Sequence, residues 1–301
     1  MFFFVILGGN LGVSCSLCEG RAVYYRSSSG HYLCISCLGR MLERSIRRYL
    51  GKFAALKPKG RVLVPVTCYN TMASLGLAYI TSFIKRGYES EIRVAIPSSV
   101  YLDQYSIDTL ARSTSIISVD VSPRYRFSNI VDTLRYDRVW SIRLAKILGY
   151  DTILLPITIT DYTILGLEAL LSGSEELLGD VVDKLTLDSV NVINALSTIE
   201  AEAIVSYAFL VGLNGYCLDD SYEKIKASRI FYSVSPKGPE LEFSSVKTID
   251  FLRGALLRKL RYTCSVCGGL SLHPDKCSSC NNNSFDKMRV EVKNNTNIYT
   301  R

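Results

Sequence analysis

Histidine and cysteine are distributed unevenly in this chain of 301 residues. Histidine occurs only as His31 and His273, and no cysteine lies between Cys68 and Cys217. This long cysteine-poor middle argues against a framework of disulfides, which is typical of small secreted domains. Long apolar runs are also missing. No stretch reaches the length of a membrane-spanning helix without a charged residue or a helix breaker, so we expect no membrane partner.

The chain begins with an apolar segment, MFFFVILGGNLGV. This segment is too short to cross a bilayer, and no basic residues precede it, as they would in a signal peptide. We interpret it as a short packed strand or as an overlong start of the chain. The protein is therefore expected to be soluble and cytoplasmic, where thiols stay reduced.

The composition favours a globular protein with an anionic partner. Apolar residues make up 48% of the chain, which is enough for one substantial core with small satellites. The formal net charge is +7, which suggests an anionic partner such as nucleic acid.

Eight of the ten cysteines form two groups of four, one near each end of the chain. Each group consists of two C-x2-C turns, separated by 15 residues in the first group and by 9 in the second. Two such turns facing each other present four thiolates in a tetrahedron, which predicts two zinc ribbons and two zinc ions. The predicted metal ligands are Cys15, Cys18, Cys34, Cys37, Cys264, Cys267, Cys277 and Cys280.

Two alternatives remain for these groups. Four thiolates also suit an iron–sulfur cluster, because ligand softness alone does not exclude iron. One cysteine ligand could also be exchanged for His31 or His273, which lie inside the two loops. Since four cysteines already complete each site, we interpret both histidines as polar loop residues.

A helix is expected over residues 38–54, directly after the first ribbon. Its basic residues share one face, where only Glu43 offsets them. This face is either a solvated surface or, as we favour, an element that contacts RNA phosphates. Tyr24, Tyr25 and Tyr32 in the ribbon could stack on unpaired bases, although we favour their packing in its small core. The predicted RNA-binding residues are Arg40, Arg44, Arg47, Arg48 and Lys52.

From residue 61 onward, apolar strands alternate with helices. This order is typical of a parallel sheet that is covered on both faces. The predicted fold class is α/β, a doubly wound and mostly parallel sheet flanked by N-terminal and C-terminal zinc ribbons. Strands are expected at 61–66, 92–96, 116–121 and 152–157, and helices near 74–86, 103–112, 129–149, 161–172, 198–212 and 244–261.

The predicted domains follow from this order of elements. The N-terminal ribbon and the basic helix form one unit, the α/β sheet a second and the C-terminal ribbon a third, followed by a flexible tail rich in asparagine and lysine. Their predicted bounds are 1–54, 55–261, 262–285 and 286–301.

The loop after the strand at 61–66 is the candidate functional site, because open α/β sheets bind ligands beyond the carboxyl ends of their strands. Residues 67–74 have the sequence TCYNTMAS. A phosphate-binding loop uses glycine for close approach of the backbone and often lysine for charge, and this loop has neither. Hydroxyl residues at both ends leave weak anion binding open, but ATP binding of the usual kind is not expected.

The order of these parts resembles the PP-loop tRNA thiolases, which have an adenine nucleotide α-hydrolase-like fold. In that family the loop is SGGKDS and leads into helix residues such as SLALAYIL; here Ser74 is followed by LGLAYI. The segment from Thr160 and Asp161 to LLSG is similar to the family's Asp-Asp motif and its LLRG ending. CSVCG at Cys264 is similar to the CxxCG that opens the family's C-terminal ribbon. The resemblance covers almost the whole chain.

The departures from the family pattern bear on function. The family activates a uridine carbonyl with ATP and delivers sulfur through cysteines or an iron–sulfur cluster. Cluster-bearing members carry a CxxC near the position of residues 134–138 and a later cysteine near Cys217. The CxxC is missing here, so no iron–sulfur cluster is expected. Only Asp161 of the acidic pair remains. The resemblance thus implies a vestigial nucleotide site of Thr67, Ser74 and Asp161.

The loop is also two residues longer than SGGKDS, which resembles the non-catalytic subunit of the eukaryotic cytoplasmic tRNA 2-thiolation complex. We interpret the chain as a tRNA-binding, catalytically degenerate subunit or paralogue of a tRNA wobble-uridine 2-thiolation enzyme, with no catalytic residue of its own. The resemblance implies three partners, namely tRNA, an active thiolase paralogue and a ubiquitin-like sulfur carrier.

Two other hypotheses remain open. One is an active ATP-dependent tRNA sulfurtransferase with a divergent site, in which Cys68 near a helix N-terminus is the nucleophile. Against it, Cys68 is more simply a small buried apolar residue. The other is a protein-assembly scaffold without an RNA role, which binds another protein in the former nucleotide cleft.

Overall fold

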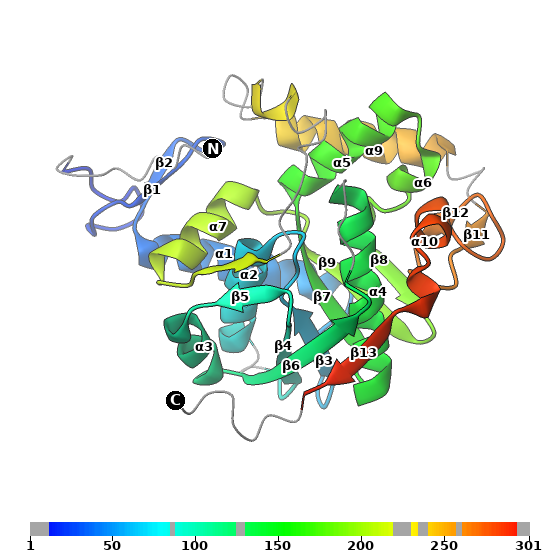
Figure 1. Ribbon diagram of the computed structural model, residues 1–301. Helices are drawn as coiled ribbons and strands as arrows, with labels where there is room; N and C mark the ends of the chain where they lie inside the picture. Colours follow the sequence, from blue (N-terminus) through cyan, green and yellow to red (C-terminus); the bar gives the residue numbers. More distant parts are fainter. Residues whose placement is uncertain are drawn as a thin grey trace.

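The computed structural model describes residues 12–84, 88–124, 130–218, 230–233, 240–256 and 261–293. A seven-stranded sheet in the order β13-β6-β4-β3-β7-β9-β8 runs through its centre (Figure 1). The five inner strands are parallel, and β13 and β8 pair antiparallel at the two edges. This arrangement confirms the predicted α/β class. The strands are β3 (Arg61–Pro65), β4 (Glu91–Pro97), β6 (Ser115–Ser122), β7 (Thr152–Thr158), β8 (Lys184–Leu187), β9 (Val190–Leu196) and β13 (Arg289–Val292).

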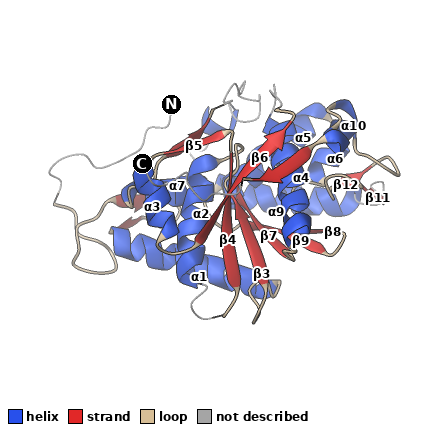
Figure 2. Cartoon of the chain, turned by 60° about the horizontal axis from the view of Figure 1, so that its bottom comes forward, coloured by secondary structure: helices blue, strands red, loops and turns tan. Residues whose placement is uncertain are grey.

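Helices cover both faces of the sheet, which explains why the inner strands are continuously apolar (Figure 2). Successive residues of β3 point to opposite faces: Val62 and Val64 belong to one buried cluster and Leu63 to the other. The first cluster includes residues of α1, α2 and α7, and the second includes residues of α4, α5 and the C-terminal ribbon. The main helices are α1 (Ile35–Lys52), α2 (Thr71–Ile84), α3 (Gln104–Ala111), α4 (Ile130–Leu148), α5 (Ile159–Ser172), α6 (Glu175–Leu178), α7 (Ala201–Leu210), α9 (Leu241–Leu256) and α10 (Ser278–Asn282).

The two cysteine-rich ribbons lie at opposite ends of the molecule (Figure 1). The first contains the antiparallel pair β1 (Tyr24–Arg26) and β2 (His31–Leu33), and the second contains β11 (Tyr262–Thr263) and β12 (Leu270–Ser271). A further antiparallel pair, β5 (Val100–Leu102) and β10 (Gly215–Cys217), forms a small sheet of its own. Among the described helices, none is both long enough and apolar enough to cross a bilayer.

The elements expected between residues 61 and 172 are all present. The expected end of the helix at 74–86 and the start of the one at 129–149 lie outside the described residues, and the other ends are shifted by a few residues. The expected helix at 198–212 is α7, and the one at 244–261 is α9, whose predicted last turn lies outside the described residues. The N-terminal apolar segment also lies outside them, except for Gly12 and Val13.

The tail after residue 285 was expected to be flexible, and this is wrong for its first part. A 3-10 turn, η3 (Phe285–Lys287), leads into β13, which pairs with β6 from Arg289↔Ser122 to Val292↔Val119. The physical reason is that apolar and polar residues alternate over this short segment, as in a strand with one buried face. Val290 and Val292 pack against the second buried cluster. The remaining domain boundaries stay predictions, although α1 shares its buried cluster with the sheet.

Candidate functional site

The loop of residues 67–74 lies where the sheet changes direction. The chain goes from β3 to β4 and β6 on one side, and later from β7 to β9 on the other. The carboxyl end of β3 is therefore the topological switch point, where open α/β sheets bind ligands. Helix α2 begins at Thr71, so the loop also contains a helix N-terminus.

Hydrogen bonds within the loop already use its polar groups. The Thr67 N–H donates to Ser74 Oγ over 3.0 Å, and the two side-chain hydroxyl groups also lie 3.0 Å apart. The Ser74 hydroxyl donates to the Asn70 carbonyl over 2.8 Å. Thr67 is 1% exposed and Ser74 is fully buried. The structure thus brings the two predicted residues together, but it holds them in bonds to the loop itself.

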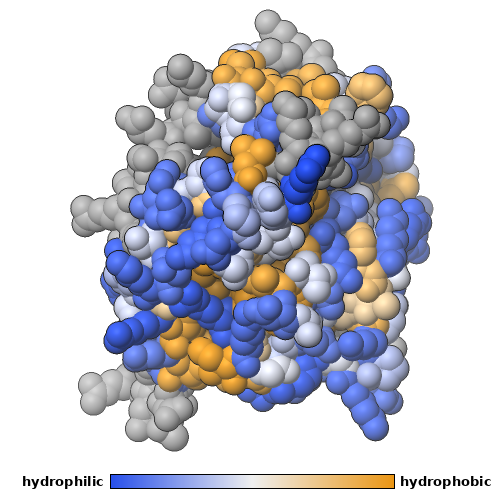
Figure 3. Space-filling model, turned by 90° about the vertical axis from the view of Figure 1, so that its right-hand side faces the viewer, coloured by the Kyte–Doolittle hydropathy of each residue, from blue (hydrophilic) through white to orange (hydrophobic). Residues whose placement is uncertain are grey.

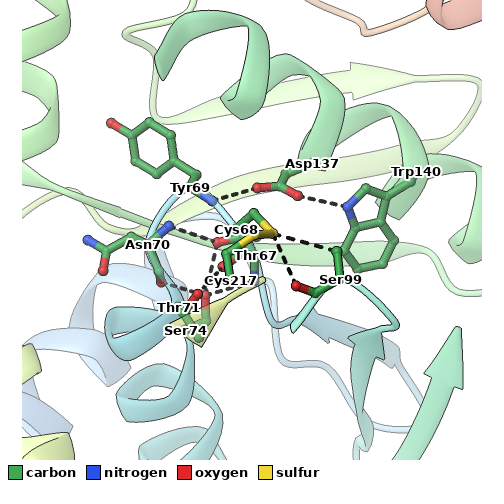
Figure 4. The surroundings of a disulfide bond; sticks show 10 residues. All are labelled: Thr67, Cys68, Tyr69, Asn70, Thr71, Ser74, Ser99, Asp137, Trp140 and Cys217. Atoms are coloured by element: carbon green, nitrogen blue, oxygen red, sulfur yellow. Dashed lines mark hydrogen bonds between the residues drawn. A yellow bond between two sulfur atoms is a disulfide. The ribbon is translucent and has the colours of Figure 1, made fainter. Parts of the chain in front are cut away.

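Asp137 of α4 supplies the loop with an internal carboxylate (Figure 4). Its Oδ2 accepts a hydrogen bond of 2.8 Å from the Tyr69 N–H, and its Oδ1 accepts one of 2.9 Å from Trp140 Nε1. Burial raises the pKa of Asp137 to about 7, although hydrogen bonds from Trp140 and from the backbone of Tyr69 and Cys68 partly offset this. The Asp137 carboxylate therefore occupies the place at which an anionic ligand would bind the Tyr69 N–H.

Asp161, the third predicted nucleotide-site residue, lies near the same loop and forms a capping box at the start of α5. Its Oδ2 accepts hydrogen bonds from the Thr158 N–H and hydroxyl over 2.8 Å and 2.7 Å. Burial raises the pKa of Asp161 to about 6, and hydrogen bonds from Thr158 and from the side chains of Tyr69 and Asn70 lower it in part. The capping box gives Asp161 a local role in capping the N-terminus of α5.

Cys68 is neither a free nucleophile nor a free buried thiol, because it forms a disulfide with Cys217 (Figure 4). The two cysteines are 149 positions apart in sequence. Strand β10 pairs with β5 so that Cys217 lies opposite Val100, and the neighbouring Ser99 Oγ lies 3.5 Å from Cys68 Sγ. Sequence analysis missed this bond because β5 and β10 are three-residue strands without a long apolar run.

The eight remaining cysteines gather in the two predicted groups of four, and within each group the sulfur atoms lie within 4.8 Å of one another. Cys18 Sγ is 3.6 Å from Cys34 Sγ, and Cys267 Sγ is 3.8 Å from Cys277 Sγ. A tetrahedral ion with zinc–sulfur bonds of about 2.3 Å requires sulfur separations of about 3.8 Å. The four sulfur atoms therefore fit one metal ion. A four-iron cluster would hold them farther apart, because each cysteine would bind a different iron.

The five predicted RNA-binding residues are all exposed on α1, whereas Leu42, Ile46 and Leu50 of the same helix are buried. Arg47 forms an ion pair of 2.6 Å with Glu43, and Arg40 Nη2 lies 3.1 Å from Cys37 Sγ. The structure thus places these cations on one accessible helix.

The ribbon tyrosines divide into two kinds. Tyr24 is 5% exposed and packs in the core, as expected. The same expectation is wrong for Tyr25 and Tyr32, which are 38% and 36% exposed, with ring centroids 4.8 Å apart. Both histidines are exposed and belong to neither cysteine group.

The chain matches no protein-family model and no curated protein. Among solved structures it is similar to the U34-tRNA thiolase NcsA from Methanococcus maripaludis, which was solved with its 4Fe-4S cluster. The TM-score is 0.66, and the match covers 91% of this chain and 95% of that chain at 17% sequence identity. The two proteins share one fold. This likeness to NcsA confirms the predicted architecture, because it extends over nearly the full length of both chains.

Proposed function

We propose that this chain is a tRNA-binding, catalytically degenerate relative of the tRNA wobble-uridine 2-thiolation enzymes. Its likeness to NcsA supports the relation. The loop of residues 67–74 is the main support for a loss of catalysis. Its polar groups form hydrogen bonds with one another and with Asp137. Adenylation with ATP needs a loop whose backbone amides approach the phosphate closely, which glycine permits, and usually a lysine for charge. This loop contains neither glycine nor lysine.

Nucleotide binding at this loop would displace groups that are already bonded. A phosphate that approached the Tyr69 N–H would compete with the Asp137 carboxylate, which is 1% exposed. Where Asp137 is ionised, repulsion between the two anions would add to the cost of that exchange. Thr67, Ser74 and Asp161 are therefore proposed as the remains of a nucleotide site, without bound ATP in the working protein.

The tRNA-binding surface is proposed to consist of α1 and the first ribbon. Exposed guanidinium and ammonium groups neutralise RNA phosphates, and the exposed rings of Tyr25 and Tyr32 suit stacking on unpaired bases. Without a site of its own, the chain would need an active thiolase paralogue. A ubiquitin-like sulfur carrier would be the sulfur source of that paralogue.

The two cysteine groups are proposed to hold one zinc ion each. The sulfur separations of 3.6 Å to 3.8 Å support a single tetrahedral ion at each group. Zinc suits these groups because four thiolates satisfy it without an open position, which is typical of structural rather than catalytic zinc.

Charge reversal on α1 tests the RNA role. Arg44 and Arg48 are exposed, and no ion pair involves them in the part of the chain that the structure describes. Changing both to Glu should weaken tRNA binding and reduce the slope of log affinity against log salt by about 1–2, because each phosphate contact contributes about 0.7–0.9 to the slope. The matched control changes Lys184 and Arg289, exposed on the two edge strands, to Glu.

The measurement is tRNA binding over a salt series, together with ATP turnover by the isolated chain. Equal slopes for both double variants would remove α1 from the RNA surface. No tRNA affinity at moderate salt would favour the assembly scaffold instead. Sulfur transfer by the isolated chain with ATP would overturn the proposal in favour of an active sulfurtransferase.

A further inference from the structure

Two arginines of α4 lie buried beneath the C-terminal ribbon. Arg135 is 4% exposed, Arg138 is 1% exposed, and both contact Asp180, which is 1% exposed. Arg135 Nη2 and Nε donate to Asp180 Oδ2 over 2.7 Å and 2.8 Å, and Arg138 Nη1 donates to Oδ1 over 2.7 Å. One buried carboxylate thus serves two buried guanidinium groups, which leaves an excess of positive charge.

This excess charge faces the second cysteine group. Arg135 Nη1 lies 3.7 Å from Cys277 Sγ. A Cβ added at Gly269 would lie 3.1 Å from Arg138 Nη1 and 3.4 Å from Cys267 Sγ, so both groups flank Gly269, and Arg138 and Cys267 interact electrostatically. Arg138 Nε and Nη2 are buried and have no hydrogen-bond partner among the described residues. Buried donors and charges of this kind are costly unless a counter-charge lies nearby.

A loaded cysteine group supplies that counter-charge. Four thiolates around a divalent ion leave two negative charges in excess, and here these charges lie directly against the arginines. Burial alone would raise the pKa of Asp180, but Arg135 and Arg138 lower it, so Asp180 stays ionised and keeps both arginines in place. The carboxylate therefore orients the guanidinium groups, and the guanidinium groups balance the metal group.

We propose that Arg135 and Arg138, oriented by Asp180, are positioning residues that hold the C-terminal metal ion within the protein core. The ion at this group leaves only when the body of the protein unfolds. The ion at the N-terminal group exchanges while the body stays folded. This inference depends on metal binding and not on the proposed RNA role.

The N-terminal cysteine group differs from the C-terminal group in the exposure of its cysteines and of the arginine beside them. Cys18 is exposed, whereas all four cysteines of the C-terminal group are buried. The only guanidinium hydrogen bond to an N-terminal sulfur in the described chain comes from Arg40, which is itself exposed. Cys15, Cys34 and Cys37 are buried, but water screens charge at the exposed Cys18, so a chelator can attack the group there without unfolding the sheet.

The C-terminal ribbon is also attached to the body by buried hydrogen bonds. Glu176 of α6 is 4% exposed, and it accepts from the Ser271 hydroxyl and from the backbone N–H groups of Leu272 and Ser278. Figure 3 shows this end of the molecule, where hydrophilic residues cover much of the middle of the face. The ribbon and the body thus form one packed unit around the cysteine group.

A chelator challenge of the unmodified zinc-loaded protein tests the difference between the two groups. We expect one ion per chain to leave early, while alkylation followed by mass spectrometry labels only the four N-terminal cysteines. The second ion should leave together with the unfolding transition. Unfolding is monitored by the fluorescence of Trp140, the single tryptophan of the chain. Early loss of the C-terminal ion from folded protein, or simultaneous loss of both, would overturn the proposal.

Two variants separate charge from packing. Arg138→Met keeps the length of the side chain but removes its charge, and it should lower metal affinity at the C-terminal group by about 10–100-fold. Arg138→Lys keeps the charge and should recover most of that affinity. Affinity is measured by competition between protein and chelator for cobalt. The thiolate-to-cobalt absorption reports the bound fraction. Equal affinities of the Met, Lys and unmodified proteins would contradict the proposal, as would equal losses in both variants.

Arg143→Met is the matched control. Arg143 donates to the carbonyls of Phe285, Asp286 and Met288, so it attaches the same ribbon without contacting a cysteine sulfur. This variant should unfold more easily and keep its cobalt affinity. If Arg138→Met does not fold, Arg135→Met removes the contact at Cys277 instead and is compared with Arg135→Lys in the same way.

Discussion

Asp137 shows how much a single buried residue can decide. The sequence around it, LRYDRVW, marked only the position where a cysteine pair was missing. In the structure its carboxylate connects the loop after β3 to Trp140 of α4. No local pattern predicts this role, because Tyr69 and Asp137 are 68 positions apart and meet only when α4 packs on the sheet.

The pKa of Asp137 gives a prediction for stability. Its folded pKa of about 7 lies above the ordinary value of 3.8, so between these values the folded protein binds more protons than the unfolded chain. The free energy of unfolding should therefore fall as the pH rises from about 4 to about 7. Asp161, with a pKa of about 6, acts in the same direction. Urea denaturation at several pH values measures this slope.

Asp137→Ala tests the assignment of that slope. The variant leaves the Tyr69 N–H and Trp140 Nε1 without their acceptor, which should cost about 1–3 kcal/mol at pH 5. Its stability should fall less steeply with pH than that of the unmodified protein, because one of the carboxyl groups with a raised pKa is gone. Identical pH slopes would show that Asp137 does not titrate in this range.

At the scale of elements, the inner strands and long helices could be predicted, but the short edge strands could not. Strand β3 and strand β7 are continuous apolar runs, so their sequences alone identify them. Strands β5, β10 and β13 have three or four residues and depend on a partner far away in the sequence. Both cysteine groups could be predicted, because their spacing itself encodes the geometry.

The capping box of α5 gives a prediction at this scale. Thr158→Val removes the hydroxyl that bonds to Asp161 while keeping the shape of the side chain. The loss of this cap should lower the free energy of unfolding by about 1–2 kcal/mol, measured by chemical denaturation. Thr248→Val on the exposed side of α9 is the control and should change stability by less than about 0.5 kcal/mol. Similar losses in both variants would argue against the cap.

For the whole molecule, the disulfide is the longest-range covalent link in the described chain. It closes a loop of 149 residues, from the candidate site to the small sheet of β5 and β10. A cross-link over such a loop restricts the unfolded chain, which stabilises the folded state by up to about 4–5 kcal/mol in the entropic model. Sequence analysis treated both cysteines separately, since spacing says nothing about pairs that the tertiary fold brings together.

Reduction of this bond tests its contribution. A phosphine reductant that spares zinc should lower the melting temperature of the unmodified protein. The variant with Cys68→Ala and Cys217→Ala should melt at the lower temperature and show no response to the reductant. A reductant effect of the same size in both proteins would assign the change to the cysteine groups instead.

Asp137 and Arg138 are consecutive residues of α4, about 100° apart around the helix axis. One holds the loop at the sheet edge, and the other borders the C-terminal metal group. A turn or slide of α4 would displace both contacts at once. The Arg138→Met variant should therefore alter hydrogen exchange at the Tyr69 amide as well as metal affinity, because one helix sets the geometry of both places.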